Sequence, residues 1–247
     1  MAGHSKWANI KHRKARQDAK RAKAWTKVIR ELTVAARLGG GNASDNPRLR
    51  AAVDNAVAVN MPKDTMDRAI ARGIGTGDEG ALEEIVYEGY GPGGVAILVE
   101  TMTDNRNRTV AGVRHAFSKF GGSLGTSGSV AYMFERRGIL QFDSSVDEDQ
   151  IMETALESGA DDVETDESGS TYVLTSFESY SSVADYFQSQ GLNPISSEVT
   201  MMPTTTTLCD GDTTEKTLSV IEALEDLDDV QNVFCNAEFT TSDDSAS

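Results

Sequence analysis

The residues whose chemistry stands out are cations crowded into the first 27 positions of the chain. Nine lysines and arginines lie between Lys6 and Lys27, where Asp18 is the one acidic residue. Closely spaced cations bind the phosphates of a nucleic acid, and arginine can hold a phosphate through two hydrogen bonds. Trp7 adds a ring that can stack on an unpaired base. The candidate nucleic-acid-binding residues here are Lys6, Trp7, Lys11, His12, Arg13, Lys14, Arg16, Lys20, Arg21, Lys23 and Lys27.

Two other interpretations of this segment stay open. One is a solvated tail that only keeps the protein soluble. The other is a mitochondrial transit peptide, which is also basic and poor in acidic residues, although such peptides are rich in serine and this segment holds only Ser5. We favour contact with nucleic acid or with a ribosome. The rest of the chain is acidic, so solubility does not require these cations.

A second cationic patch is predicted at residues 103–109, where a strand passes into a helix. Asp104 or Asn105 is expected to cap that helix. Capping does not explain the arginines that follow, because cations at a helix N-terminus oppose the helix dipole. The predicted phosphate-facing patch consists of Arg106, Arg108, Arg114 and Lys119.

No pattern of residues predicts catalysis, a metal or a cofactor. Residues 75–80 and 89–94 match the G-x-G-x-x-G of dinucleotide sites, but neither stands between a strand and a helix as that site requires. The three histidines lack cysteines or carboxylates at ligand spacing. Acidic residues at 161–167 crowd a predicted turn, which is typical of a solvated loop rather than a metal-dependent nuclease. We therefore expect a protein that is not an enzyme.

Charge is divided unevenly along the 247 residues. Residues 1–72 hold 16 basic and 6 acidic residues, residues 73–137 hold 6 and 8, and residues 138–247 hold 1 and 25. The net charge of −16 is therefore the sum of +10, −2 and −24. A polyanion is attracted to the first third of such a chain and repelled by the last, and salt weakens the attraction. The acidic run at 222–229 is expected to be the wet face of a helix.

Composition limits where the protein can work. No apolar run reaches the roughly 20 residues of a membrane helix, and the opening lacks the apolar core of a secretory signal. Two cysteines, Cys209 and Cys235, are too few for a disulfide scaffold. We expect a soluble, cytoplasmic protein without a membrane partner.

Apolar spacing predicts three short helices near the start. The first carries a stripe from Trp25 to Ala36 and ends at the glycines 39–41. Asn46 and Pro47 are expected to begin the second helix as N-cap and first residue. Met61-Pro62 precedes the third helix, which Gly73 is expected to end. A glycine-rich hinge at 73–80 is predicted to follow this small bundle.

Strands and helices alternate through the remainder. Strands are expected at 84–90, 95–102 and 129–135, with a helix from about Arg106. Residues 138–203 follow a βαββαβ order, with Asp147 as a helix N-cap and Gly159 as a helix end. A strand at 204–209, a helix, and a strand at 231–239 complete the pattern.

The predicted fold class is a multidomain α+β protein, in which an N-terminal three-helix bundle precedes two α/β (ferredoxin-like) domains, one inserted in the other. The bundle with its N-terminal arm is expected at residues 1–75, and a discontinuous α/β domain at 81–136 plus 204–239. The inserted domain is expected at 138–203, and residues 240–247 are expected to be a disordered tail.

Several stretches of the chain resemble the YebC family. They are Met1–Lys14, Ala35–Gly41, Asn60–Lys63, Tyr87–Gly94, Thr103–Thr109, Ser127–Val130 and Leu224–Gln231. The resemblance covers residues 1 to about 238. It implies a helical bundle followed by two α/β domains, one inserted in the other. It also implies one of two roles: a transcriptional regulator that binds promoter DNA, or a translational activator that relieves stalling on ribosomes.

The sequence therefore predicts a non-enzymatic, nucleic-acid-binding regulator of gene expression, with DNA or ribosomal RNA as its partner. DNA binding through the basic N-terminal domain is the favoured prediction, and contact with ribosomal RNA is the alternative. The oligomeric state stays open. Reading of DNA sequence would require helices that carry base-contacting side chains. The second and third helices offer Arg48, Arg50, Lys63, Arg68 and Arg72.

Overall fold

The computed structural model describes residues 21–75, 82–166 and 168–239, with backbone only for residues 21–24. Grouped by their contacts, these residues form two compact units. One holds Tyr132–Leu208 and the residues from Asn236 onward, and the other holds the residues up to Ala131 together with Cys209–Cys235. Each unit is described separately, and the domain boundaries expected from the sequence remain predictions. The predicted arm, most of the hinge and the tail lie outside the described residues.

Three helices open the second of these units: α2 (Arg21–Gly39), α3 (Pro47–Ala58) and α4 (Lys63–Ile74). The buried Asn46 side chain joins the first two helices. Its oxygen accepts from Leu49 N at 3.1 Å, and its amide donates to the carbonyls of Ala35 and Gly40 at 2.8 and 2.9 Å. One side chain thus caps α3 and satisfies carbonyl groups at the end of α2, as the predicted N-cap requires.

Gly73 does not end α4, which continues to Ile74. A Cβ at this position would stand 2.3 Å from the Thr33 carbonyl oxygen and 2.9 Å from the Ala36 Cβ, both on α2. The glycine therefore lets two helices approach closely instead of stopping one of them. The sequence-based interpretation was wrong because it judged the glycine by its local conformation.

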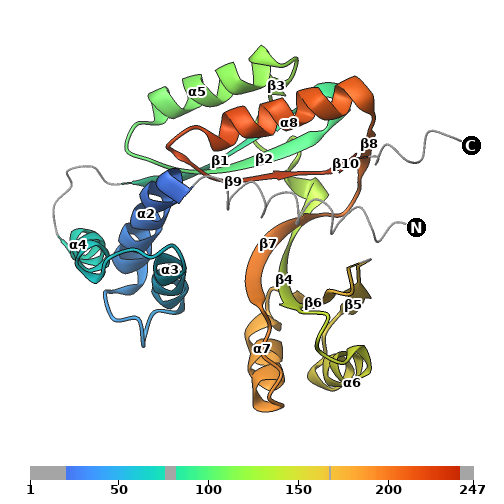
Figure 1. Cartoon of the computed structure of the whole chain (residues 1–247). Coiled ribbons are helices and arrows are strands. Elements are labelled where there is room, and N and C mark those ends of the chain that lie inside the picture. Colours follow the sequence, from blue (N-terminus) through green and yellow to red (C-terminus); the bar gives the residue numbers. More distant parts are fainter. Residues whose placement is uncertain (1–20, 76–81, 167, 240–247) are drawn as a thin grey trace, which may run out of the picture. The chain divides into compact units, whose positions relative to one another are not determined.

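Sheet A follows the helices. Its strand order is β3-β1-β2-β9, built from β1 (Glu83–Tyr90), β2 (Ala96–Thr103), β3 (Ser123–Leu124) and β9 (Val230–Cys235). All neighbours in it are antiparallel. Helices α5 (Arg106–Lys119) and α8 (Gly211–Glu225) lie side by side over one face (Figure 1). The short η1 (Pro92–Gly94) joins β1 to β2.

A buried carboxylate fixes the loop that follows β3. Glu88 accepts hydrogen bonds from the backbone N–H groups of Gly128, Val130 and Ala131 at 2.6 to 2.7 Å. Burial by itself would raise the pKa of Glu88, but these three donors hold it below its ordinary value. The loop is therefore organised around an internal anion.

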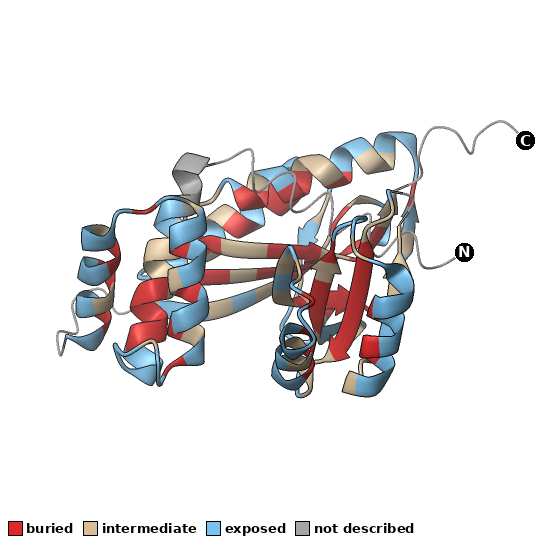
Figure 2. Cartoon of the chain, turned by 60° about the horizontal axis from the view of Figure 1, so that its bottom comes forward, coloured by how far each residue is buried: buried red, intermediate tan, exposed pale blue. Residues whose placement is uncertain are grey.

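Sheet B forms the core of the other unit and has the order β5-β6-β4-β7 with all neighbours antiparallel. Its elements run β4 (Phe134–Phe142), α6 (Glu148–Ser158), β5 (Asp162–Thr165), β6 (Thr171–Ser176), α7 (Tyr180–Ser189) and β7 (Ser196–Pro203). This βαββαβ order confirms the sequence pattern. Asp147 caps α6, and Gly159 ends it at a φ of 76°. Buried positions, red in Figure 2, follow the central strands.

The strand expected at 129–135 and the first strand of the expected βαββαβ pattern are one continuous strand, β4, that begins only at Phe134. The residues before it form a turn and the short helix η2 (Ala131–Met133). Gly138 permits this continuity. A Cβ there would stand 2.3 Å from atoms of Thr175 and Tyr180, so the bare backbone makes room for Tyr180 against the strand.

The last predicted strand, 231–239, is divided at Asn236. Its first part is β9 of sheet A, and its second part is β10 (Ala237–Phe239), which pairs with β8 (Thr207–Cys209) in a separate two-stranded sheet. The Asn236 carbonyl accepts from Thr207 N at 2.8 Å, and its amide donates to the Thr207 hydroxyl at 3.2 Å. These bonds hold Asn236 at the point where the chain leaves sheet A and enters the two-stranded sheet.

The close approach at Gly73 gives a stability prediction. We expect Gly73→Ala to lower the free energy of unfolding by about 1–3 kcal/mol, because the new methyl group overlaps the backbone of α2. Gly75→Ala is the matched control, since its Cβ would lie 3.5 Å from its nearest neighbours. Urea unfolding measures both variants. Equal midpoints for the two would show that α2 and α4 are not closely packed.

Candidate nucleic-acid interface

The second predicted patch lies at the start of α5, where capping follows the expected pattern. Asn105 is the N-cap, and its side chain accepts from Arg108 N at 3.0 Å. The hydroxyl of Thr103 accepts from Asn105 N at 2.9 Å. Both interactions fix the point at which β2 passes into α5, and therefore the first turn of the helix, which carries Arg106 and Arg108.

The buried side chain of Asp229 pairs with two arginines. Its side chain is only 8% exposed, and its oxygens lie 2.9 Å from Arg30 Nη1 and 2.9 Å from Arg108 Nη2. The Thr109 hydroxyl donates to it at 2.7 Å. Arg30 also donates to the carbonyls of Met102, at 3.0 Å, and Asp228. Helices α2 and α5 are therefore both fastened to the turn that precedes β9.

The charge of this carboxylate is stabilised by its neighbours. Burial by itself would raise the pKa of Asp229, but hydrogen bonds from Thr109 and Arg108 and the charges of Arg30 and Arg108 hold this pKa below its ordinary value. The side chain thus stays ionised in the folded protein at neutral pH. The expectation that the run 222–229 is a wet helix face was wrong for Asp229 and for Glu225, which are 6% and 7% exposed.

A second ionic contact joins the helices to sheet A. Arg48 of α3 donates to Glu31 of α2 at 2.6 Å and to Glu84 of β1 at 2.6 Å. Both carboxylates raise the pKa of the guanidinium further above its ordinary value. Arg48 was one of the residues considered for base reading, and the structure places it in an internal ion-pair network instead.

Two cations of α5 remain on its outer surface. Arg106 and Arg114 are exposed, and neither makes an ion pair or a hydrogen bond with any residue that the structure describes. The α5 sequence contains no carboxylate, whereas its neighbour α8 carries Asp212, Glu215, Glu222 and Glu225. Lys119, at the other end of α5, lies over the Phe120 ring at 5.1 Å.

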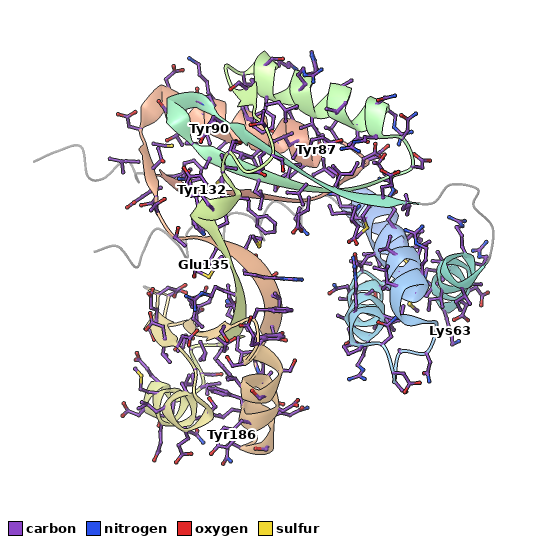
Figure 3. The ribbon with its side chains drawn as sticks, turned by 180° about the vertical axis from the view of Figure 1, so that it is seen from behind. Lys63, Tyr87, Tyr90, Tyr132, Glu135 and Tyr186 are labelled. Atoms are coloured by element: carbon purple, nitrogen blue, oxygen red, sulfur yellow. The ribbon has the colours of Figure 1, made fainter. Side chains whose placement is uncertain are left out.

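Tyr87 of β1, labelled in Figure 3, lies near the start of this surface. Its hydroxyl oxygen is buried and has no hydrogen-bond partner among the described residues. Burial raises the pKa of Tyr87, while the positive charge of Arg106 acts to lower it. The start of α5 thus combines an unpaired guanidinium with a nearby buried hydroxyl.

The structure places the residues predicted to bind nucleic acid in different environments. Lys27 donates to the carbonyl of Gln231 at 3.4 Å, and Arg108 is held by Asp229 and Asp104, so both are used inside the protein. Arg21 and Lys23 belong to α2, but only their backbone is described. Six lysines and arginines, together with Trp7 and His12, lie outside the described residues: Lys6, Lys11, Arg13, Lys14, Arg16 and Lys20.

Within the described ranges no group of three or more His, Cys, Asp or Glu side chains is placed to hold a metal ion. No described helix is both long enough and apolar enough to cross a membrane.

Two family descriptions match almost the whole chain. "TACO1/YebC protein N-terminal domain" matches residues 5–76, and "TACO1/YebC second and third domain" matches residues 82–237. The chain belongs to the TACO1/YebC family. The resemblance found in the sequence motifs is thereby confirmed.

Relatives of this TACO1/YebC protein carry regulatory names. A "probable transcriptional regulatory protein" of Pseudomonas syringae pv. syringae is 60% identical over 238 residues, which is 96% of each chain. The "transcriptional regulatory protein PmpR" of Pseudomonas aeruginosa is 61% identical over the same length and the same share of each chain.

A solved structure shares the fold of this TACO1/YebC chain. It is the crystal structure of a conserved hypothetical protein from Aquifex aeolicus, 43% identical in sequence. It matches with a TM-score of 0.81 over 91% of this chain and 93% of the other. The predicted fold class, three helices followed by sheet-containing domains, is confirmed.

Sequence reasoning missed the Arg30–Asp229 contact. The two residues are almost 200 positions apart, and each has charged neighbours that make it look like an ordinary surface residue. One signal was present. Asp228 and Asp229 directly precede the strand that begins at Val230, and this position brings the Asp229 carboxylate to α2 and α5.

Replacing Asp229 tests its role in this TACO1/YebC protein. We expect Asp229→Asn to lower the free energy of unfolding by about 3 kcal/mol, since Arg30, whose side chain is only 17% exposed, loses its counter-charge and Arg108 keeps only Asp104. Asp228→Asn is the matched control because it removes the same charge from an exposed neighbour. Urea unfolding at pH 7 measures both variants, and equal losses of free energy would contradict the role of Asp229 as a counter-charge for Arg30 and Arg108.

The pH dependence follows from the sign of the pKa shift. The Asp229 pKa is lower in the folded state than in the unfolded chain, so its contribution is complete above about pH 4 and is lost as the pH falls through the folded pKa. The free energy of unfolding of the Asp229→Asn variant should therefore decrease less than that of the parent protein as the pH falls below about 4.

Proposed function

We propose that this chain is a regulator of gene expression that acts by binding nucleic acid and catalyses no reaction. The observation that carries the proposal is the division of charge: +10 in residues 1–72 and −24 in residues 138–247. A molecule with this polarity approaches a polyanion with its basic part first. The regulatory names of its 60–61% identical relatives support the same class of function.

The proposed interface has two parts. The main part is the basic N-terminal segment, residues 6–23, and the second is the outer surface of α5. In α5 the contact is assigned to Arg106 and Arg114, whose guanidinium groups have no ion-pair partner in the described part of the chain. Arg108 contributes indirectly, because its bonds to Asp104 and Asp229 fix the helix start. A cytoplasmic location and the absence of a membrane partner belong to this proposal.

DNA is the first candidate target, and ribosomal RNA is the second. One observation favours the second. Of the five side chains considered for base reading, Arg48, Arg50, Lys63 and Arg68 all bind other groups of the protein. Lys63, labelled in Figure 3, pairs with Asp67 at 3.0 Å. Reading of a promoter needs base-contacting groups in a groove, whereas phosphate contact does not.

Cross-linking in cells followed by sequencing of the bound DNA and RNA tests the proposal. A regulator of transcription is expected to recover a defined set of promoter fragments, and a translation factor is expected to recover ribosomal RNA as the main product. A variant with residues 1–20 deleted serves as the control and should recover neither. Recovery of no nucleic acid above that control would contradict the proposed function.

A further inference from the structure

Helix α8 carries a row of carboxylates along one exposed side. The acidic row consists of Asp212, Glu215 and Glu222 within the helix and Asp226 at its C-cap. These residues follow one another at steps of three, seven and four, which places them on one side of a helix. All four are exposed. The basic residue of α8, Lys216, pairs with Asp212 at 2.6 Å, so the row as a whole stays negative.

The acidic row and the proposed phosphate contacts of α5 belong to one layer of one unit. Helices α5 and α8 lie side by side over the same face of sheet A (Figure 1). They approach closely, because a Cβ at Gly112 of α5 would stand 3.3 Å from Leu227 Cδ2, two residues beyond the end of α8. The axes of packed helices are about 8–10 Å apart. A cationic helix and an acidic one are therefore direct neighbours.

Arg106 and Arg114 lie on the side of α5 that faces away from α8. Each residue turns a helix by about 100°, so Arg114 and Arg106 lie about 160° and about 120° around α5 from Gly112. The charge of Arg106 acts on Tyr87 of β1, whereas α8 packs on β9 at the opposite edge of the sheet. A strand bound at both arginines therefore follows the far side of α5 from the acidic row.

A single strand and a duplex meet this surface differently. A single strand can follow the two arginines, which are about 12 Å apart along the helix axis, and it brings no second backbone. A duplex brings a second backbone across a groove about 6 or about 12 Å wide. This distance is close to the spacing of the two helices, so a duplex lying over the layer places its second backbone above α8. Charges there interact within a screening length of about 10 Å at 0.1 M salt.

Turning the duplex the other way does not remove the cost. A duplex displaced from α8 extends past β3, the edge strand of sheet A, and so contacts less of this surface. Either position weakens the binding of a duplex, and neither affects a single strand.

We propose that the α5 surface selects single-stranded nucleic acid, and that the acidic row of α8 is the element that disfavours a duplex. This inference rests on the proposed function and names the form of nucleic acid that the surface takes. One backbone of a duplex still reaches Arg106 and Arg114, so a duplex binds, but more weakly, because the acidic row repels the other backbone. The selectivity comes from a repulsive contact with the competitor.

Neutralising the centre of the acidic row tests the proposal. The probes are a mixed-sequence DNA strand and the duplex that it forms with its complement, measured at one low salt concentration. We expect Glu215→Gln with Glu222→Gln to lower the ratio of the duplex Kd to the single-strand Kd several-fold, because the second backbone is no longer repelled. Asp149→Asn with Glu153→Gln is the matched control. It removes the same charge from exposed carboxylates of a helix in the other unit and should leave the ratio unchanged.

A combined variant shows whether the effect depends on α5. With Arg106→Gln and Arg114→Gln already in place, nucleic acid is no longer held beside α8. Adding Glu215→Gln and Glu222→Gln should then change the ratio much less than it does in the parent protein, since the two pairs of residues are coupled only through the bound nucleic acid.

Two outcomes would overturn the selection of single strands. The first is an unchanged ratio in the α8 variant, and the second is an equal change in the α6 control, which would assign the effect to net charge alone. Failure of the parent protein to bind either probe would instead overturn the proposed function on which the inference rests.

Discussion

The contact between Asp229 and its two arginines is the constraint on which the rest of the second unit depends. A buried carboxylate is tolerated only when its charge is balanced and its oxygens are hydrogen-bonded. Arg30, Arg108 and Thr109 supply that balance from α2 and α5. Segments near residues 30, 108 and 229 are thereby held at one place, and the orientation of α5 is fixed at its first turn.

Ion pairs with the protein's own carboxylates divide the described arginines into two classes. Arg30, Arg48 and Arg108 are bound to internal carboxylates, which lowers the charge they offer to any ligand. Arg106 and Arg114 stay on the outer surface of α5 without such partners in the described residues. The net charge of a segment therefore indicates which part of the chain attracts a polyanion, but not which of its cations contact phosphates. The arrangement of ion pairs is a guide to these cations, because an exposed cation already paired with a carboxylate gains less from a phosphate.

Local signals in the sequence predicted local structure well. Asn46, Asn105 and Asp147 cap helices through side-chain bonds to residues two or three positions away, so their effect can be inferred from neighbouring residues alone. The βαββαβ pattern of residues 134–203 is also carried by short-range periodicity. These features gave the fold class before any spatial information was considered.

Features that depend on distant residues were predicted poorly. The sequence predicts Gly73 as a helix stop, but its role is set by its close approach to Thr33 on another helix. The division of the last strand at Asn236 depends on Thr207. In the candidate interface, Arg106, Arg108 and Arg114 are all exposed, and Arg108 is the one that pairs with Asp104 and with the distant Asp229.

The salt dependence of binding to a short duplex tests this account most directly, because each phosphate contact adds about one to the slope of log affinity against log salt concentration. Arg106→Gln with Arg114→Gln should reduce the slope by about two relative to the parent. Lys63→Gln with Lys216→Gln removes the same charge from side chains already paired with Asp67 and Asp212, and it should leave the slope unchanged. Equal slopes for the two double variants would contradict the claim that internal ion pairing decides which cations meet phosphates.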